Sequence, residues 1–450
     1  MPNGSTRTGA KARILTGPRG TFAYMFTLGD TRCSGYGGTE SQLAHFPNEE
    51  TRARFEEFGS VWGLRGKRRY RLATRVGRRT SGRFRQFGLN DRPTTIGDHP
   101  PTRGMETRMN KSRSGRYFED YRIGETIEHA TPRTVTDGER ALYRALYPAR
   151  HAVHSSDTFA RNCGLKRSPI DDLTVFHVVF GKTVPDVSLN AVANLGYAEG
   201  RWILPVWPGD TLRSVSEVIG LRENSSGKSG IVWVRTTGLN ERNERVLEYV
   251  RWVMVRKRDP GRPAPPTVVP ALQKAVSADQ IVVPEGLDFR RYDFGAAGER
   301  HRWRDYQPGE TIDHIDGVTI EEAEHMMATR LWQNTARVHF DATARPDGRR
   351  LVYGGHVISL ARALSHNGLA NAQMIAALNS GTHVNPCFAG DTLRAWSEVI
   401  EKTETTAPGV GAVRLRLVAT RGAPFVLRDA DGKFLPEVLL DLDYWALMPM

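Results

Sequence analysis

The sequence predicts an α+β fold made of two copies of one unit, each with a long helix and a run of antiparallel strands. The main observation is a repeated phrase: DYRIGETIEH (120–129) returns as DYQPGETIDH (305–314), 185 residues later. A second phrase, GDTLRSVSEVI (209–219), returns as GDTLRAWSEVI (390–400), 181 residues later. The same order and nearly the same spacing indicate an internal duplication. A site between two such halves can have one working half and one supporting half.

The first element is a basic extension, residues 1–113. It holds 22 Lys and Arg against 9 Asp and Glu, whereas residues 114–450 hold 41 of each. Its Gly- and Arg-rich composition shows no sustained apolar period, so we predict disorder. It could be a tail for RNA or an anionic surface, an Arg-rich targeting segment, or sequence upstream of the true start at Met109. We favour the third interpretation.

The remaining composition excludes several classes of protein. No apolar stretch approaches the roughly 18 residues that a membrane helix needs. The three cysteines are widely scattered, which favours a reduced, cytoplasmic protein without a metal site. Because the charge of the duplicated body is balanced, we expect no nucleic-acid partner for it.

The first repeat spans residues 114–258. After the DYRIGETI segment come two helix-like stretches, TVTDGERALYRALY and DDLTVFHVVFGKTV (171–184), and then strand-like segments such as SGIVWVRTTGLN. The Pro-rich run RDPGRPAPPTVVP (258–270) opens a linker that we place at 259–298.

The second repeat, residues 299–450, follows the same order. Thr319 and Glu322 have the spacing of a capping box, and Thr134 and Asp137 lie at the equivalent positions. Within 354–372, apolar residues recur at the period of a buried helical face, and alternation in VGAVRLRLVATRG predicts a strand. A curved sheet wrapped around the long helix would bury that helix.

Several long phrases now carry a resemblance, among them PIDDLTVFHVVFGKTVPDVSLNAVANLGYAEGR, EYVRWVMVRKRDP and VYGGHVISLAR. Residues 114–450 resemble the MaoC-type hydratases of the hot-dog fold, and within them the mesaconyl-CoA hydratases (β-methylmalyl-CoA dehydratases). The resemblance implies a double hot-dog and the reversible addition of water to mesaconyl-CoA. It further implies an acyl-CoA substrate, no metal or redox cofactor, no membrane partner and a homodimer.

The same resemblance implies the catalytic residues. The MaoC-type motif D-x-N-P-x-H places a catalytic Asp five residues before a catalytic His. In NTARVHFD the His position is His339, Asp341 follows it, and the Asp position holds Asn334. An amide cannot accept a proton, so Asn334 would orient the water and His339 would act as acid and base. The first repeat has His154 and Ala149 at these positions, which suggests a supporting half.

The substrate also needs an oxyanion site and a cation. Gly354 and Gly355 open the second long helix, where free N–H groups could stabilise the thioester oxygen. We expect Gly355 N–H to be the donor, and Arg337 to bind the substrate carboxylate, with Arg330 and Arg362 as alternatives. Asp341 could equally cap a turn. Other histidines, including His177 and His383, are expected to be packing or surface residues.

Two other functions stay open at this point. One is a different hot-dog enzyme, such as an (R)-specific enoyl-CoA hydratase with another acyl preference or an acyl-CoA thioesterase. The other is a non-catalytic acyl-CoA or nucleic-acid binding protein. Asn334 at the Asp position favours these alternatives slightly, and the long matching phrases outside the motif favour the hydratase.

Overall fold

The computed structural model describes residues 111–112, 115–148, 150–422 and 425–450, together with four strands near the N-terminus. The chain divides into two compact units, Met1–Met105 and Glu106–Met450. In the first unit an antiparallel sheet is formed by β1 (Lys11–Thr16), β2 (Phe22–Leu28), β3 (Thr31–Gly37) and β4 (Gln42–Ala44). The disorder that we predicted for residues 1–113 stays a prediction. The rest of the predicted extension lies almost wholly outside the described residues.

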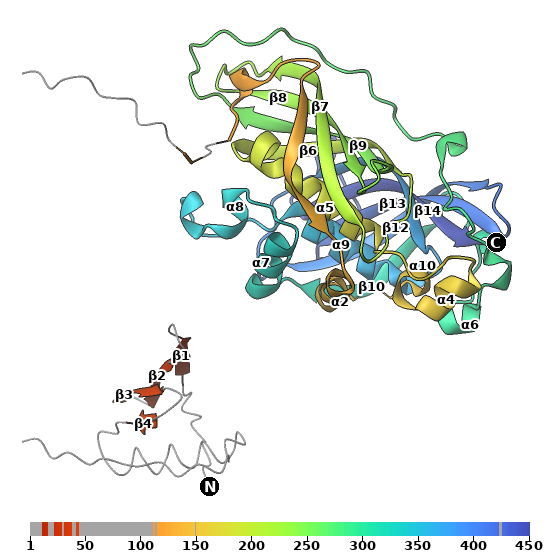
Figure 1. The fold of residues 1–450 in the computed structure, drawn as a ribbon, viewed down its shortest axis with the longest axis horizontal. Helices are drawn as coiled ribbons and strands as arrows, with labels where there is room; N and C mark the ends of the chain where they lie inside the picture. The colour runs from red at the N-terminus through yellow and green to blue at the C-terminus, as the bar shows by residue number, and fades with distance from the viewer. Residues whose placement is uncertain are drawn as a thin grey trace, which may run out of the picture. The chain divides into compact units, whose positions relative to one another are not determined.

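The second unit contains one ten-stranded antiparallel sheet in which the two repeats meet at the centre (Figure 1). The first repeat contributes β5 (Thr126–Thr134), β6 (Ala191–Trp202), β7 (Thr211–Glu223), β8 (Ser229–Leu239) and β9 (Arg245–Arg256). The second contributes β10 (Thr311–Thr319), β11 (Met374–His383), β12 (Thr392–Glu404), β13 (Val410–Arg421) and β14 (Val438–Pro449). The order β10-β12-β13-β14-β11-β6-β9-β8-β7-β5 is the same in both halves, read outward from the β6–β11 pair. The predicted duplication is confirmed.

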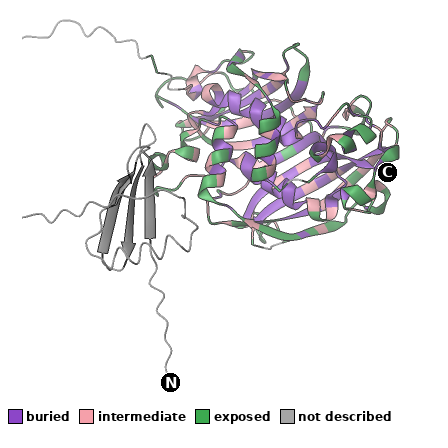
Figure 2. Cartoon of the chain, turned by 60° about the horizontal axis from the view of Figure 1, so that its bottom comes forward, coloured by how far each residue is buried: buried purple, intermediate pink, exposed green. Residues whose placement is uncertain are grey.

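Two long helices, α5 (Asp172–Thr183) and α9 (Gly354–Leu364), form the centre of the unit. All residues of α5 are buried, and so are all residues of α9 except Gly354. The two helices touch, because His177 Nε2 lies 2.7 Å from Ser359 Oγ. Buried residues accordingly gather along these helices and the strands that pack on them (Figure 2). Among the described helices, none is long and apolar enough to cross a membrane.

Shorter helices surround this centre. They are α2 (Asp137–Leu146), α3 (Ala152–Ser155), α4 (Asp157–Asn162), α6 (Phe294–Ala297), α7 (Glu322–Leu331), α8 (Arg337–Phe340) and α10 (His366–Leu369). The predicted capping boxes are wrong in register. Thr319 ends strand β10, where its hydroxyl pairs with Thr392 at 2.8 Å, and α2 is capped by Thr136 with Glu139. A strand hydroxyl pair thus replaces the expected helix cap.

The segment 259–298 connects the halves and packs along both half-sheets. Leu221 and Val268 exchange two backbone hydrogen bonds of 2.8 Å, which attach the segment to the first half. Further on, Val276 N donates to Asn379 Oδ1 at 2.9 Å and Val276 O accepts from Trp445 Nε1 at 3.0 Å. The segment therefore follows a fixed path from one half to the other.

Candidate active site

His339 is held in one orientation between α8 and the segment that leads into α9. Its Nδ1 donates to the carbonyl of Leu351 at 2.9 Å, and Leu351 N donates to the carbonyl of Val338 at 2.8 Å. Because a carbonyl can only accept, the neutral ring carries its proton on Nδ1. Nε2 then has a free lone pair and can accept a proton.

The surroundings of His339 keep this ring neutral. Burial lowers its pKa from 6.5 to about 4, and the hydrogen bond to Leu351 only partly opposes that effect. The charged form is disfavoured because the half-buried ring is largely shielded from water. At neutral pH the resting side chain is therefore neutral and ready to accept a proton.

The N-terminus of α9 lies beside this histidine and has no side-chain cap. Its N-cap residue, Tyr353, makes no side-chain cap, and the Tyr353 and His339 rings lie 5.8 Å apart. The first N–H groups of a helix lack partners within the helix, so those of Gly354 and Gly355 can donate to a negative oxygen. This is the feature that an oxyanion site requires.

The two glycines are required by the protein's own packing. A Cβ on Gly354 would lie 2.4 Å from the ring of His383, and one on Gly355 would lie 2.6 Å from His177 Cε1. Aromatic and imidazole rings of the protein therefore lie against both Cα atoms.

The other predicted residues lie in the same region with different environments. Asn334 is buried, and its Oδ1 accepts from Ala336 N at 3.1 Å, which leaves its amide N–H group as the part able to act on a ligand. Asp341 caps a turn, accepting from Thr343 N at 2.9 Å and from its hydroxyl at 2.7 Å. Arg337 is exposed at the first position of α8.

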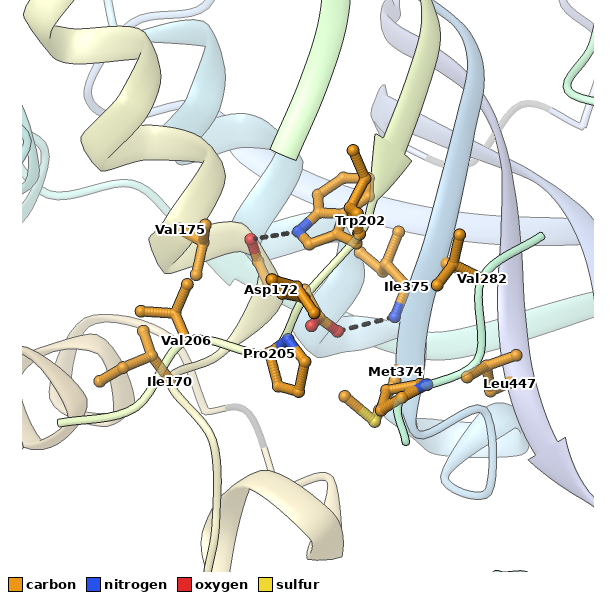
Figure 3. A pocket seen from close by; sticks show the side chains of 14 residues that line it. Ile170, Asp172, Val175, Trp202, Pro205, Val206, Val282, Met374, Ile375 and Leu447 are labelled. Atoms are coloured by element: carbon orange, nitrogen blue, oxygen red, sulfur yellow. Dashed lines mark hydrogen bonds between the residues drawn. The ribbon is translucent and has the colours of Figure 1, made fainter. Parts of the chain in front are cut away.

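The equivalent place in the first repeat is closed by carboxylates. Asp171 Oδ1 accepts from Leu173 N at 3.0 Å, which occupies the N-terminus of α5. Asp172 Oδ2 accepts from Ile375 N at 2.7 Å and lies 3.2 Å from His154 Nε2, and its carbonyl accepts from Trp202 (Figure 3). Two carboxylates at this helix end would repel a thioester oxyanion. Of the two helix N-termini, the one in the second repeat is therefore the open one.

Comparisons with known proteins identify the family of this pattern. The family model for mesaconyl-CoA hydratase matches residues 99–423. A mesaconyl-CoA hydratase from Cereibacter sphaeroides is 72% identical over 341 residues, which are 75% of this chain and 99% of that protein. The chain belongs to the mesaconyl-CoA hydratase family.

Solved structures support the fold of this mesaconyl-CoA hydratase family member. A putative MaoC domain protein dehydratase from Chloroflexus aurantiacus is 58% identical, with a TM-score of 0.74, and covers 76% of this chain and 99% of its own. A Mycobacterium tuberculosis protein described as a double hotdog fold is 24% identical, with a TM-score of 0.60 over 74% of this chain and 98% of its own. The predicted double hot-dog is confirmed.

One residue beside the candidate site of this family member was given no role by the sequence analysis. His383, at the end of β11, was expected to be a packing residue. Its ring lies on Gly354, its Nε2 is 3.1 Å from Tyr197 OH, and the charge of His339 adds to the burial that lowers its pKa to about 4. A signal was present, since His383 stands shortly before the repeated GDTL turn, where the first repeat has Trp202.

Proposed function

We propose that this chain catalyses the reversible hydration of mesaconyl-CoA (2-methylfumaryl-CoA) to β-methylmalyl-CoA, which makes it a hydro-lyase. The observation that carries the proposal is that His339, with a free Nε2, lies beside an uncapped helix N-terminus in the second repeat. Identity of 72% with a protein named for this reaction supports the choice of substrate.

The mechanism follows from these two features. Nε2 of His339 takes a proton from water while the water oxygen bonds to the β-carbon. The electron pair of the double bond moves toward the thioester, whose oxygen gains negative charge. Backbone N–H of Gly355, with Gly354 beside it, stabilises that charge. The protonated His339 then gives its proton to the α-carbon, so atoms and charge balance within one cycle.

Two further residues have supporting roles in this proposal. Because Oδ1 of Asn334 is used by Ala336 N, its amide N–H can donate to the attacking water but cannot take a proton. Asp341 already accepts two hydrogen bonds from Thr343, so we propose that it fixes the turn after His339. In the mechanism it is a positioning residue.

The assay follows the absorbance of the conjugated thioester when purified protein is mixed with mesaconyl-CoA. We expect the absorbance to fall to an equilibrium value, without release of free CoA thiol. Thiol release would indicate a thioesterase. Crotonyl-CoA, tested in parallel, separates this reaction from that of a general enoyl-CoA hydratase, because faster turnover of crotonyl-CoA contradicts the proposed substrate.

The remaining proposals concern conditions and assembly. Hydration is redox-neutral and uses only proton transfer and hydrogen bonding in this mechanism, so we propose that it needs no metal or redox cofactor. A cytoplasmic location is supported by Cys163 and Cys387, which are both buried free thiols. We propose a homodimer, which sedimentation of the purified protein would test.

A further inference from the structure

Arg251 is a buried cation inside the first repeat. It lies on β9 with none of its side chain exposed, and its Nη2 donates to Thr183 Oγ1 at 2.7 Å. The only other hydroxyl within reach is that of Ser188, at 3.4 Å, while Nε has no hydrogen-bond partner among the described residues. The guanidinium is thus held by neutral groups and remains partly unsatisfied.

A buried charge normally has a partner of opposite charge. Among the described residues, no carboxylate oxygen lies within 4.0 Å of an Arg251 nitrogen. Asp186 is a carboxylate in the same region, because its charge raises the pKa of Tyr121 while the charge of Arg251 lowers it. Its Oδ2 lies 2.9 Å from His129 Nδ1. The end of α5 at Thr183 supplies only a partial negative charge. Arg251 therefore has no close counter-ion in the part of the chain that the structure describes.

Arg251 lies close to the proposed site. Its Cζ is 4.3 Å from the centre of the Phe180 ring, which is 5.8 Å from the Tyr353 ring at the open N-terminus of α9. It also pairs in register with Tyr197, whose hydroxyl lies 3.1 Å from His383. Burial raises the pKa of Tyr353, and the charge of Arg251 opposes this rise, so the guanidinium acts on the site electrostatically.

The second repeat contains a comparable buried cation, Arg362, whose hydrogen-bond partners are the neutral Ser365 hydroxyl and the Ala372 carbonyl. Arg362 lies on α9, and its Cζ is 5.8 Å from the centre of the Tyr444 ring on β14. In the first repeat the cation is on the strand and the aromatic ring is on the helix, and in the second repeat this arrangement is reversed. Near Arg362 the N-terminus of α5 carries Asp171 and Asp172. Burial raises the pKa of Asp171, and the charges of His154 and Arg362 oppose that rise.

The two helix ends therefore differ in one respect. Where α5 has Asp171 and Asp172, α9 has Tyr353 and Gly354, so these two positions of α9 carry no carboxylate that could face Arg251. Mesaconyl-CoA carries a carboxylate roughly 4 Å from its thioester carbon, the span of a planar trans four-atom chain. A substrate with its thioester at Gly355 would bring that carboxylate toward the wall that contains Arg251.

We propose that Arg251 is the counter-ion of the substrate's free carboxylate and determines the preference for a dicarboxylic acyl group. This inference rests on the proposed function and replaces the expectation placed on Arg337. Arg337 is exposed, and water screens an exposed guanidinium so that it discriminates weakly. A desolvated guanidinium recognises a carboxylate far more strongly.

The test compares two substrates in two variants. Mesaconyl-CoA and (E)-2-methylbut-2-enoyl-CoA differ only in a carboxylate replaced by a methyl group. For Arg251→Met we expect kcat/KM for mesaconyl-CoA to fall about 100-fold or more relative to kcat/KM for the methyl analogue. Arg362→Met removes a comparable buried cation that was an alternative candidate for the carboxylate, and serves as the matched control. We expect no change in this ratio, and a selective fall in this variant would overturn the proposal.

An equal loss for both substrates in Arg251→Met would mean a structural role and would overturn the proposal. If that variant does not fold, the wild-type protein still decides. We expect succinyl-CoA to bind at least about 10-fold more tightly than butyryl-CoA by calorimetry, and equal binding would overturn the proposal. Failure of the wild type to hydrate mesaconyl-CoA would instead contradict the proposed function, and this binding comparison does not depend on turnover.

Discussion

His339 is a base because three local contacts make it one. The Leu351 carbonyl fixes the proton on Nδ1, burial disfavours the charged ring, and α8 holds the backbone. We predict that His339→Ala lowers kcat for mesaconyl-CoA by about 10²–10⁴-fold, the usual contribution of a positioned general base. Initial rates on protein with unchanged circular dichroism check this.

The matched control is His154→Ala, which removes the histidine at the equivalent motif position of the first repeat. Its ring pairs with Asp172, so we expect lower stability but retained turnover per folded molecule. Full activity in His339→Ala, or an equal loss in both variants, would contradict the assignment of the base to the second repeat.

The pH dependence follows from the lowered pKa of His339. Only the neutral ring accepts a proton, so hydration is supported above the pKa and lost as the pH falls through it. With the pKa lowered to about 4, we predict that kcat/KM stays level from pH 7 to about 5 and falls below that. An acid limb centred near 6.5, the ordinary value for histidine, would show that the ring is not buried in the free enzyme.

For single residues, the sequence could predict those that are assigned by their spacing within a motif. His339 was assigned from its place in the motif. For Asp341 the sequence allowed either a catalytic role or a turn cap, and its contacts with Thr343 favour the cap. His383, which lies on Gly354, and Arg251, which we propose as a counter-ion, were not among the predicted site residues. Their importance comes from contacts with Gly354 and Phe180, which are distant in sequence, and no local pattern reports such contacts.

At the scale of elements, the difference between the repeats is a difference between two helix ends. Both central helices were predicted from apolar patterns, but such patterns do not predict whether a side chain caps the helix N-terminus. Asp171 closes the N-terminus of α5 with its carboxylate, whereas Tyr353 leaves that of α9 open. The sequence has Asp-Asp at the first place and Tyr-Gly at the second, and only the structure shows which N–H groups have no side-chain cap.

Gly354→Ala tests the fit at this open end. The new Cβ would lie 2.4–2.8 Å from three atoms of the His383 ring, so the ring must move or the helix must shift. We predict a loss of about 1–3 kcal/mol in the free energy of unfolding, typical of overpacking, with a fall in kcat. Denaturant unfolding and initial rates measure the two effects.

Its control is Gly295→Ala in α6, where the nearest atom to the new Cβ is 3.3 Å away on the Asp293 side chain. That change should be nearly neutral. Adding His383→Ala to Gly354→Ala removes the clash. The double variant should therefore lose less free energy of unfolding than the sum of the losses in the two single variants. Simple additivity would show that the ring and the helix end do not interact.

At the scale of the whole molecule, the duplication was readable because the strands that it repeats kept their lengths. β5 and β10 both have nine residues, and β7 and β12 both have thirteen. The joining of the halves through β6 and β11 was not readable, since pairing between strand edges leaves no distinctive residue pattern. That join nevertheless sets the two helix ends and the buried cations in their places.

The N-terminal unit offers the last prediction, because the charge of the chain is uneven. Residues 1–113 hold 22 basic against 9 acidic side chains, whereas residues 114–450 hold 41 of each. Every residue of the proposed site lies in the unit that spans Glu106–Met450. We therefore predict that a chain starting at Met109 keeps the kcat and KM of the full chain for mesaconyl-CoA. The same truncation should abolish retention on a cation exchanger at pH 7, since it removes most of the excess charge. Loss of hydration with retained folding would show that residues 1–108 contribute to the site, and would require the site to extend beyond the second unit.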